Sequence, residues 1–394
     1  MSTWINLLCW VVALLVSMPM WVVIVETMGA LVYKKQGGVD SNSVALPSTV
    51  VLVPAHNEET VIRRTLESLT ADLPPNCRIL CIAHNCSDAT SEIARQFGAE
   101  VLEVSDKGTG GKPDALKAGL RSLDENPPEL VVIVDADCVV APGSVKALAS
   151  EAKRLGHPVM GAYLFAQADA GIGKSTVSSL AVTLKNYIRP LGLQRLGMPC
   201  LLNGSGSAYP FKVIRNVPHG DGSIAEDYQL TIDLLRKGFP TTFLPEARVD
   251  GQLPSRDSTA QRQRRRWEHG HLILAFRVAP RLFLEGLLKL DRNRLALSLE
   301  LAVPPLAFLG LMWVGATVGS LFVFILNGDG PMRFLSVTGL AFVAAVLAGW
   351  IRFAGAGKTF FALASIPRYL MWKLPMYRDF FIRRETRWMK TGRD

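Results

Sequence analysis

The sequence predicts an α/β domain with a mostly parallel sheet and apolar helices near both ends of the chain. Between residues 46 and 281, short apolar runs typical of strands alternate with amphipathic helical runs, which is the pattern of βαβ units. The mean hydropathy of +0.23 is high for a 394-residue chain with 20% charged residues. An ordinary soluble protein of this size is less apolar, so the surplus must be concentrated in a few segments.

Three apolar segments are long enough to cross a bilayer, which takes about 20 residues. The first, 4–33, carries a single charged residue, Glu26, and no Lys or Arg precedes Lys34. A cleaved signal peptide has a charged start and a shorter apolar run, so an uncleaved anchor is favoured. The other two segments are 295–327 and 334–350. Pro304 and Pro305 interrupt the second segment, which is either one span or an interfacial helix followed by a span.

Basic residues flank these segments and predict their orientation. Lys34 and Lys35 follow the first segment, Arg292 and Arg294 precede the second, and a series of Lys and Arg residues follows the third. Because such flanks stay in the cytoplasm, we expect a multi-pass protein of the inner cell membrane with a cytoplasmic catalytic domain. The net charge of +9 then reflects contact with membrane lipids, at about 1 kcal/mol per basic group, and no nucleic-acid partner is expected. The predicted organisation is an anchor (1–35), an α/β domain (46–281), interfacial and transmembrane helices (282–355) and a basic amphipathic cytoplasmic tail (356–394).

The α/β domain begins with a regular series of elements. Strands are predicted at 48–55, 77–83, 99–105 and 129–137, and helices at 57–69, 87–98 and 112–123. In the first helix, one face collects Val61, Ile62, Thr65, Leu66 and Leu69. Ligands of open parallel sheets bind beyond the carboxyl ends of the strands. The segments "PAHNEE", "AHNCSD" and "DADC" are therefore expected along one edge of the sheet.

Two acids, Asp135 and Asp137, end the most apolar strand. Side chains two apart on a strand share a face, so this pair repels itself unless a positive charge lies between the carboxylates. One interpretation is a turn just past the strand, with Asp137 bonding the backbone. The position at the carboxyl end of the sheet favours a divalent cation instead, Mg²⁺ or Mn²⁺, that bridges to a diphosphate.

Residues near two other strand ends have both a structural and a functional interpretation. Asn57 is suited to capping the following helix, with Glu58 near its positive end. Lys112 follows the glycine-rich "GTGG" and is either a solvated lysine or a point charge for a phosphate.

Two helix starts later in the chain carry further candidates. Ser223 and Glu226 have capping-box spacing, which explains Glu226 and leaves Asp227 unexplained. In the first turn of a helix Asp227 is held ionised, as a base for a hydroxyl proton must be. In "QRQRRRW", Gln263, Arg266 and Trp267 share one helical face. One interpretation is that this basic helix lies on lipid headgroups. The other is that its arginine binds a diphosphate while the neighbouring indole stacks on a sugar ring.

Taken together, these motifs resemble the membrane-embedded inverting glycosyltransferases of family 2, the relatives of cellulose, chitin and hyaluronan synthases. The resemblance spans about 50–267 and rests on "VPAHNEE", "DAD" at 135–137, "ED" at 226–227 and "QRRRW" at 263–267, in the family's order. "LNGSGSAYP" is similar to the acceptor-side loop of the family.

The resemblance implies a GT-A fold, a nucleotide-sugar donor that is most often UDP-linked, and Mg²⁺ or Mn²⁺ at Asp135 and Asp137. It also implies that Asp227, beside Glu226, deprotonates the acceptor hydroxyl in a single displacement that inverts the anomeric centre. The implied donor-binding residues are Pro54, His56, Asn57, Glu58, His84, Asp88, Lys112, Asp135 and Arg266. The implied acceptor-binding residues are Gly204, Ser205, Gly206, Gln263 and Trp267.

The chain departs from the family pattern at one position. His84 stands where the family usually has an acid that contacts the nucleotide base, and Asp88 ends the same turn. The preference for UDP is therefore an open question.

We expect a membrane-bound inverting hexosyltransferase that extends a saccharide acceptor in polysaccharide or exopolysaccharide synthesis, compatible with a homo-oligomer. The alternative is transfer of a single sugar to a lipid acceptor. An inactive scaffold or sensor is disfavoured because Asp137 and Asp227 are both present. A soluble dehydrogenase is disfavoured because no G-x-G-x-x-G follows the first strand. The six cysteines include no CxxC pair and are interpreted as reduced structural thiols.

Overall fold

The computed structural model describes residues 2–34, 46–105, 111–165, 174–218, 225–251, 257–327 and 330–382. The chain forms two compact units. An α/β unit comprises 34–167, 199–267 and 386–394, and a helical unit comprises 1–33, 168–198 and 268–385. The predicted domain boundaries at 35, 46, 281 and 355 stay predictions.

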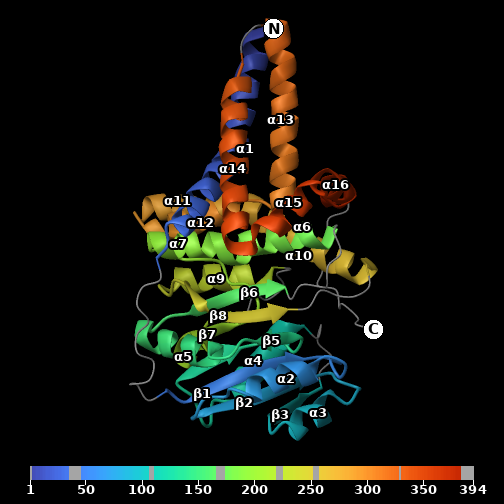
Figure 1. Ribbon diagram of the computed structural model, residues 1–394. Coiled ribbons are helices and arrows are strands. Elements are labelled where there is room, and N and C mark those ends of the chain that lie inside the picture. The colour runs from blue at the N-terminus through green and yellow to red at the C-terminus, as the bar shows by residue number, and fades with distance from the viewer. Residues whose placement is uncertain are drawn as a thin grey trace. The chain divides into compact units, whose positions relative to one another are not determined.

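The α/β unit contains one eight-stranded sheet (Figure 1). Its spatial order is β3-β2-β1-β4-β7-β6-β8-β5. The strands are β1 (Thr49–Ala55), β2 (Cys77–His84), β3 (Glu100–Val104), β4 (Leu130–Ile133), β5 (Cys138–Val140), β6 (Val159–Phe165), β7 (Ser207–Pro210) and β8 (Thr242–Gly251). The predicted α/β class with a mostly parallel sheet is confirmed.

The first half of the sheet follows the predicted βαβ pattern, and the second half adds antiparallel pairs. Strands β3, β2, β1 and β4 pair in parallel, as do β6 and β8. Strand β7 is antiparallel to both β4 and β6, and β5 is antiparallel to β8. Consequently the carboxyl ends of β1, β2 and β4 lie at the same edge of the sheet.

Helices of the α/β unit bury the faces that their periodicity predicts. They are α2 (Ile62–Thr70), α3 (Thr90–Gln96), α4 (Lys112–Ser122), α5 (Ser144–Leu155), α8 (Phe211–Ile214) and α9 (Glu226–Arg236). Helix α2 buries Ile62, Thr65, Leu66 and Leu69. Burial of one such leucine or isoleucine stabilises the fold by about 1.5–3 kcal/mol. Helix α4 packs so closely on β2 that a Cβ on Gly119 would lie 2.3 Å from Ile82 Cδ1.

Three long apolar helices characterise the helical unit. They are α1 (Ser2–Leu31), α13 (Leu306–Asn327) and α14 (Met332–Ala354), and they pack against one another (Figure 1). Each is long and apolar enough to cross a membrane. Each also exposes large apolar side chains, such as Leu15, Val318 and Leu340, which are 61–72% exposed. Exposed apolar faces of this size mark contact with lipid or protein.

The remaining helices of this unit are shorter. They are α6 (Lys174–Thr183), the π-helix η1 (Leu184–Ile188), α7 (Arg189–Leu196), α11 (Ala279–Leu288), α12 (Arg292–Ala302), α15 (Ala356–Leu363) and α16 (Ile366–Ile382). Helix α12 ends before Pro304 and Pro305, and α13 begins after them. The 295–327 segment is therefore two helices, because proline removes a helical hydrogen bond and disfavours the α conformation in the residue before it.

A buried ion-pair network links three helices of this unit. Arg189 Nε lies 2.5 Å from Glu26 Oε2, and Arg189 Nη2 lies 2.5 Å from Glu300 Oε2. All three side chains are at most 6% exposed. Helices α1 and α7 meet closely, since a Cβ on Gly192 would lie 1.8 Å from the Glu26 carbonyl oxygen. Glu26, the single charge of the first apolar segment, is thus neutralised inside the protein.

Candidate active site

The two acids of "DADC" lie in a turn between β4 and β5. The Cys138 N–H donates to the Asp135 carbonyl oxygen at 3.1 Å, which closes the turn. The predicted geometry, two acids sharing one face of a strand, was therefore wrong. The turn nevertheless brings the acids together, because carboxylate oxygens of Asp135 and Asp137 and the Cys138 Sγ all lie within 4.8 Å of one another.

This donor set fits a divalent cation. Two carboxylates are the ligands that Mg²⁺ and Mn²⁺ take in nucleotide sites. Burial raises the pKa of Asp135 to about 6, with Lys112 lowering it and Asp137 raising it. A positive charge already occupies part of this space, since Lys112 Nζ lies 2.6 Å from Asp135 Oδ1. The turn therefore has the ligands to hold a divalent cation beside the Lys112 ammonium group.

Lys112 is the first residue of α4, after Gly111 as its N-cap. Its ammonium group contacts Asp135 and donates to the Gly204 carbonyl oxygen. Burial lowers the pKa of Lys112, but the carboxylates of Asp135 and Asp227 raise that pKa by more, so its net shift is upward. Lys112 is thus a partly buried, charged group rather than a solvated lysine. The preceding residues 106–110 lie outside the described part of the chain.

The loop "LNGSGS" holds the acids in place from the other side. The Ser205 hydroxyl, which is buried, accepts a hydrogen bond from the Asp135 N–H at 3.0 Å. The Gly206 N–H donates to the Ile133 carbonyl oxygen at 2.9 Å. Gly204 has φ +80°, and a Cβ there would lie 2.9 Å from Asp227 Oδ2. The loop therefore joins the carboxylate turn to Asp227.

Asp227 and Glu226 form the first turn of α9. The Asp227 carbonyl oxygen accepts from the Thr231 hydroxyl at 2.8 Å. Burial and the neighbouring Asp227 raise the pKa of Glu226 to about 7, and Lys112 and Arg266 oppose the shift. The Glu226 Oε2 atom is buried and has no hydrogen-bond partner among the residues that the structure describes. Ala225 is the N-cap residue and makes no side-chain cap bond, while Ser223 of the predicted capping box lies outside the described residues.

The motif at 263–267 lies on α10 (Asp257–Arg277). Trp267 stacks on Phe165 at the end of β6, with ring centroids 6.1 Å apart and an angle of 16° between the planes. Arg266 is close enough to lower the pKa of Glu226. Gln263 is partly exposed on the same helix. The motif thus brings the Arg266 cation toward Glu226 and sets the Trp267 indole against the end of β6.

The predicted donor-side residues form two interlocked loops, one after β1 and one after β2. Pro54 lies within β1. His56 Nδ1 donates to the His84 carbonyl oxygen at 2.7 Å, and the His84 side chain is buried.

Asn57 and Asp88 complete the link between these loops. Asn57, with φ 55°, accepts from the Ser87 N–H at 2.8 Å. The capping role predicted for Asn57 is wrong, because the N-cap of α2 is Val61. The Glu58 N–H donates to the Thr90 hydroxyl, and Asp88 Oδ2 accepts from the Glu59 N–H.

Three residues that interact with predicted site residues were missed by the sequence reasoning. Cys138 contributes to the ligand cluster, Phe165 supports Trp267, and Tyr209 lies buried on β7. Burial and the charge of Asp227 raise the pKa of Tyr209. Only Cys138 had a usable signal, its position directly after the two acids. The other two reach the site through long-range contacts that no local pattern reveals.

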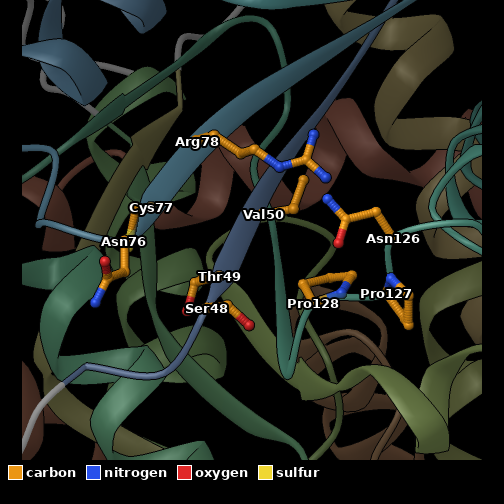
Figure 2. Close-up of a pocket in the computed structure, with 9 residues that line it drawn as sticks. All are labelled: Ser48, Thr49, Val50, Asn76, Cys77, Arg78, Asn126, Pro127 and Pro128. Carbon is orange, nitrogen blue, oxygen red and sulfur yellow. The ribbon is translucent and has the colours of Figure 1, made fainter.

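A separate pocket lies at the amino ends of β1, β2 and β4, and Figure 2 shows the residues that line it. Its volume is about 260 Å³, and its lining is Ser48, Thr49, Val50, Asn76, Cys77, Arg78, Asn126, Pro127 and Pro128. None of the predicted site residues lines it. Ligands of α/β sheets bind at the carboxyl edge, so this pocket is not the candidate active site.

The sequence of residues 47–270 matches the model of the family described as glycosyltransferase like family 2. The chain belongs to this family. It is 28% identical over 280 residues to the probable glycosyltransferase YdaM of Bacillus subtilis, and 26% identical over 284 residues to the uncharacterized glycosyltransferase YaiP of Escherichia coli. These alignments cover 66% and 69% of the chain, and 62% and 65% of the two relatives. The chain thus spans less than two thirds of the length of the curated relatives that it matches.

The fold of this glycosyltransferase-like chain is also similar to a solved structure. The mannosyltransferase PcManGT from Pyrobaculum calidifontis, in complex with GDP-Man and Mn²⁺, matches it with a TM-score of 0.54 and 16% sequence identity. The match covers 90% of this chain and 98% of PcManGT. The similarity confirms the predicted GT-A fold.

Proposed function

We propose that this protein is a metal-dependent inverting glycosyltransferase that moves a sugar from a nucleotide-sugar to a hydroxyl group of a saccharide acceptor. The observation that carries the proposal is the cluster of Asp135, Asp137, Lys112 and Asp227 at the carboxyl edge of the sheet. It combines a cation site, a fixed positive charge and a third acid.

On the donor side, Asp135 and Asp137 hold Mg²⁺ or Mn²⁺, which neutralises charge on the diphosphate when bound. The Mn²⁺ and GDP-Man in PcManGT support this assignment. Lys112 and Arg266 bind the leaving diphosphate. The ends of β1 and β2 and the loops that follow them surround the nucleotide, through Pro54, His56, Asn57, Glu58, His84 and Asp88. UDP is the nucleotide that the family resemblance favours.

On the acceptor side, Asp227 accepts the proton of the attacking hydroxyl. The acceptor oxygen forms a bond to the anomeric carbon while the bond from that carbon to the diphosphate oxygen breaks, so the centre inverts. Trp267 stacks on the acceptor sugar, and Gln263 and the Gly204–Gly206 loop bind its hydroxyls. One base and one positively charged diphosphate site suffice, because no covalent intermediate forms.

The setting of this chemistry is a membrane. Helices α1, α13 and α14 are long, apolar and exposed, which supports three crossings. The Lys and Arg residues that flank these segments favour a catalytic unit in the cytoplasm. The proposed acceptor is a growing polysaccharide. Transfer of one sugar to a lipid is the second candidate. The exposed apolar helices of the same chain would suit a lipid acceptor.

The proposal is tested with membranes that contain the protein and a panel of UDP-glucose, UDP-GlcNAc, UDP-galactose, UDP-glucuronate and GDP-mannose. Nucleotide release is measured with and without Mn²⁺. We expect turnover of one sugar nucleotide, UDP-linked, that depends on Mn²⁺. Product length, measured by mass spectrometry, separates polymer extension from single transfer to lipid.

Asp233→Asn is the matched control for Asp227→Asn, because Asp233 lies on the same helix α9 and its carboxylate bonds only Gln229 among the side-chain hydrogen bonds described for it. The proposal requires that Asp137→Asn and Asp227→Asn lose turnover while Asp233→Asn retains it. Turnover that does not depend on metal would contradict the metal assignment. Turnover of GDP-mannose alone would contradict the UDP assignment.

A further inference from the structure

Cys138 occupies an unusual place for a core thiol. It begins β5, its side chain is 0% exposed, and its Sγ donates to Asp137 Oδ1 at 3.4 Å. The sulfur and carboxylate oxygens of Asp135 and Asp137 lie within 4.8 Å of one another. In the part of the chain that the structure describes, no other cysteine belongs to such a group of three ligand atoms.

We propose that Cys138 gives the Asp135–Asp137 cation site a sulfur donor, so that the site also binds a thiophilic divalent cation such as Cd²⁺ through one sulfur and two carboxylates. The proposal rests on the proposed function only for placing the catalytic cation at these two acids. Nothing in the family match or the relatives assigns a role to this thiol.

The geometry of the three atoms supports a shared ion. Zn²⁺, which takes the same donor types as Cd²⁺, lies about 2.3 Å from a thiolate sulfur and about 2.0–2.2 Å from a carboxylate oxygen. One such ion can therefore touch sulfur and oxygen atoms that lie up to about 4.5 Å apart, and Cys138 Sγ lies 3.4 Å from Asp137 Oδ1. Lys112 already places a positive charge at Asp135 in this space.

The chemistry of the donor atoms decides which ion binds more tightly. Carboxylates alone suit Mg²⁺ and Mn²⁺, whereas a sulfur ligand selects softer metals. On Cd²⁺ binding the thiol proton passes to the buffer and the Sγ lone pair forms the new bond, with no change of oxidation state. Cd²⁺ would then occupy the position that Mn²⁺ needs and compete with it.

The test is a Cd²⁺ titration of the purified full chain in detergent, without sugar nucleotide. The readout is the ultraviolet charge-transfer absorption of the cadmium–sulfur bond. In the unaltered protein we expect one saturating equivalent whose absorption falls when a large excess of Mn²⁺ is added. This competition needs no variant, so it tests the proposal even if a substitution prevents folding.

Three variants complete the experiment. Cys138→Ser should lose this absorption, and Asp137→Asn should weaken Cd²⁺ binding by about tenfold or more, within the range seen when groups around a metal are altered. Cys200→Ser is the matched control, because Cys200 is also buried but bonds the Thr241 carbonyl oxygen. It should keep the full absorption.

The proposal is overturned if Cys138→Ser retains the absorption, if Asp137→Asn leaves the Cd²⁺ affinity unchanged, or if a large excess of Mn²⁺ does not reduce the absorption. Its failure is distinguishable from failure of the proposed function. Binding is read without turnover, so an enzyme that transfers sugar with Mn²⁺ and shows no cadmium–sulfur band contradicts only the role of Cys138. A protein with the band and no transferase activity contradicts only the proposed reaction.

Discussion

Gly204 offers a sharp test of how the acceptor-side loop and Asp227 work together. A Cβ at this position would lie 2.9 Å from Asp227 Oδ2, whereas ordinary contact begins at 3.4 Å. In Gly204→Ala the carboxylate and the loop must therefore separate by about 0.5 Å. A misplacement of 1 Å can cost about 100-fold in rate, so we expect kcat to fall by roughly 10- to 100-fold, or about 1.4–2.7 kcal/mol.

Backbone strain has to be separated from this effect. Gly204 has φ +80°, and an alanine there costs about 1–2 kcal/mol in any case. Gly156→Ala is the matched control, because Gly156 has φ +69° and a Cβ there meets nothing within 4 Å. Both variants should unfold at a similarly reduced temperature, but only Gly204→Ala should lose kcat in a radiolabelled sugar-transfer assay. Wild-type kcat in a folded Gly204→Ala protein would refute the contact between this loop and the base.

Three other predictions concern charged groups. Lys112→Met removes the cation that contacts Asp135, so calorimetry should show tighter Mn²⁺ binding and weaker sugar-nucleotide binding; an equal loss of both would contradict the assignment. Arg189→Met leaves Glu26 and Glu300 buried without their partner and should cost about 3–5 kcal/mol of stability, measured by thermal unfolding in detergent, whereas a loss below about 1 kcal/mol would mean that the network is hydrated. The pKa of Glu226 is raised to about 7 by burial, so the folded state holds a proton that the unfolded chain releases near pH 4.5. The stability that this proton contributes is complete below pH 4.5 and is lost as the pH rises through about 7, by up to about 3 kcal/mol. Glu226→Gln should reduce this loss of stability with pH in thermal unfolding. An identical pH profile of stability in the variant would show that Glu226 is not a buried protonated acid.

Local patterns in the sequence predicted the elements that bury one face. Helix α2 was predicted from the spacing of Ile62, Thr65, Leu66 and Leu69. The parallel half of the sheet was predicted from the alternation of strands and helices. The apolar segments predicted the three long helices, whereas the break between α12 and α13 at Pro304 and Pro305 was only one of the two alternatives that the sequence left open. These features depend on neighbours in sequence, so periodicity and length reveal them.

Features that depend on distant neighbours were not predictable in the same way. The antiparallel pairing of β7 depends on contacts with β4 and β6. Asn57 has capping chemistry, but the Ser87 N–H, on another loop, competes successfully for its side chain. The bond from Lys112 to Gly204 joins residues 92 positions apart. The acids of "DADC" were placed correctly at a strand end, although a turn rather than a strand pairs them.

The central claim, that Asp227 is the base, is tested most directly by the single-turnover rate of sugar transfer at saturating sugar nucleotide and Mn²⁺. Asp227→Asn keeps the shape of the side chain and removes its ability to accept the proton. We predict a rate lower by about 100- to 10,000-fold, the usual range for loss of a general base, with sugar-nucleotide affinity within about twofold of the unaltered protein. A transfer rate equal to that of the unaltered protein would contradict the account.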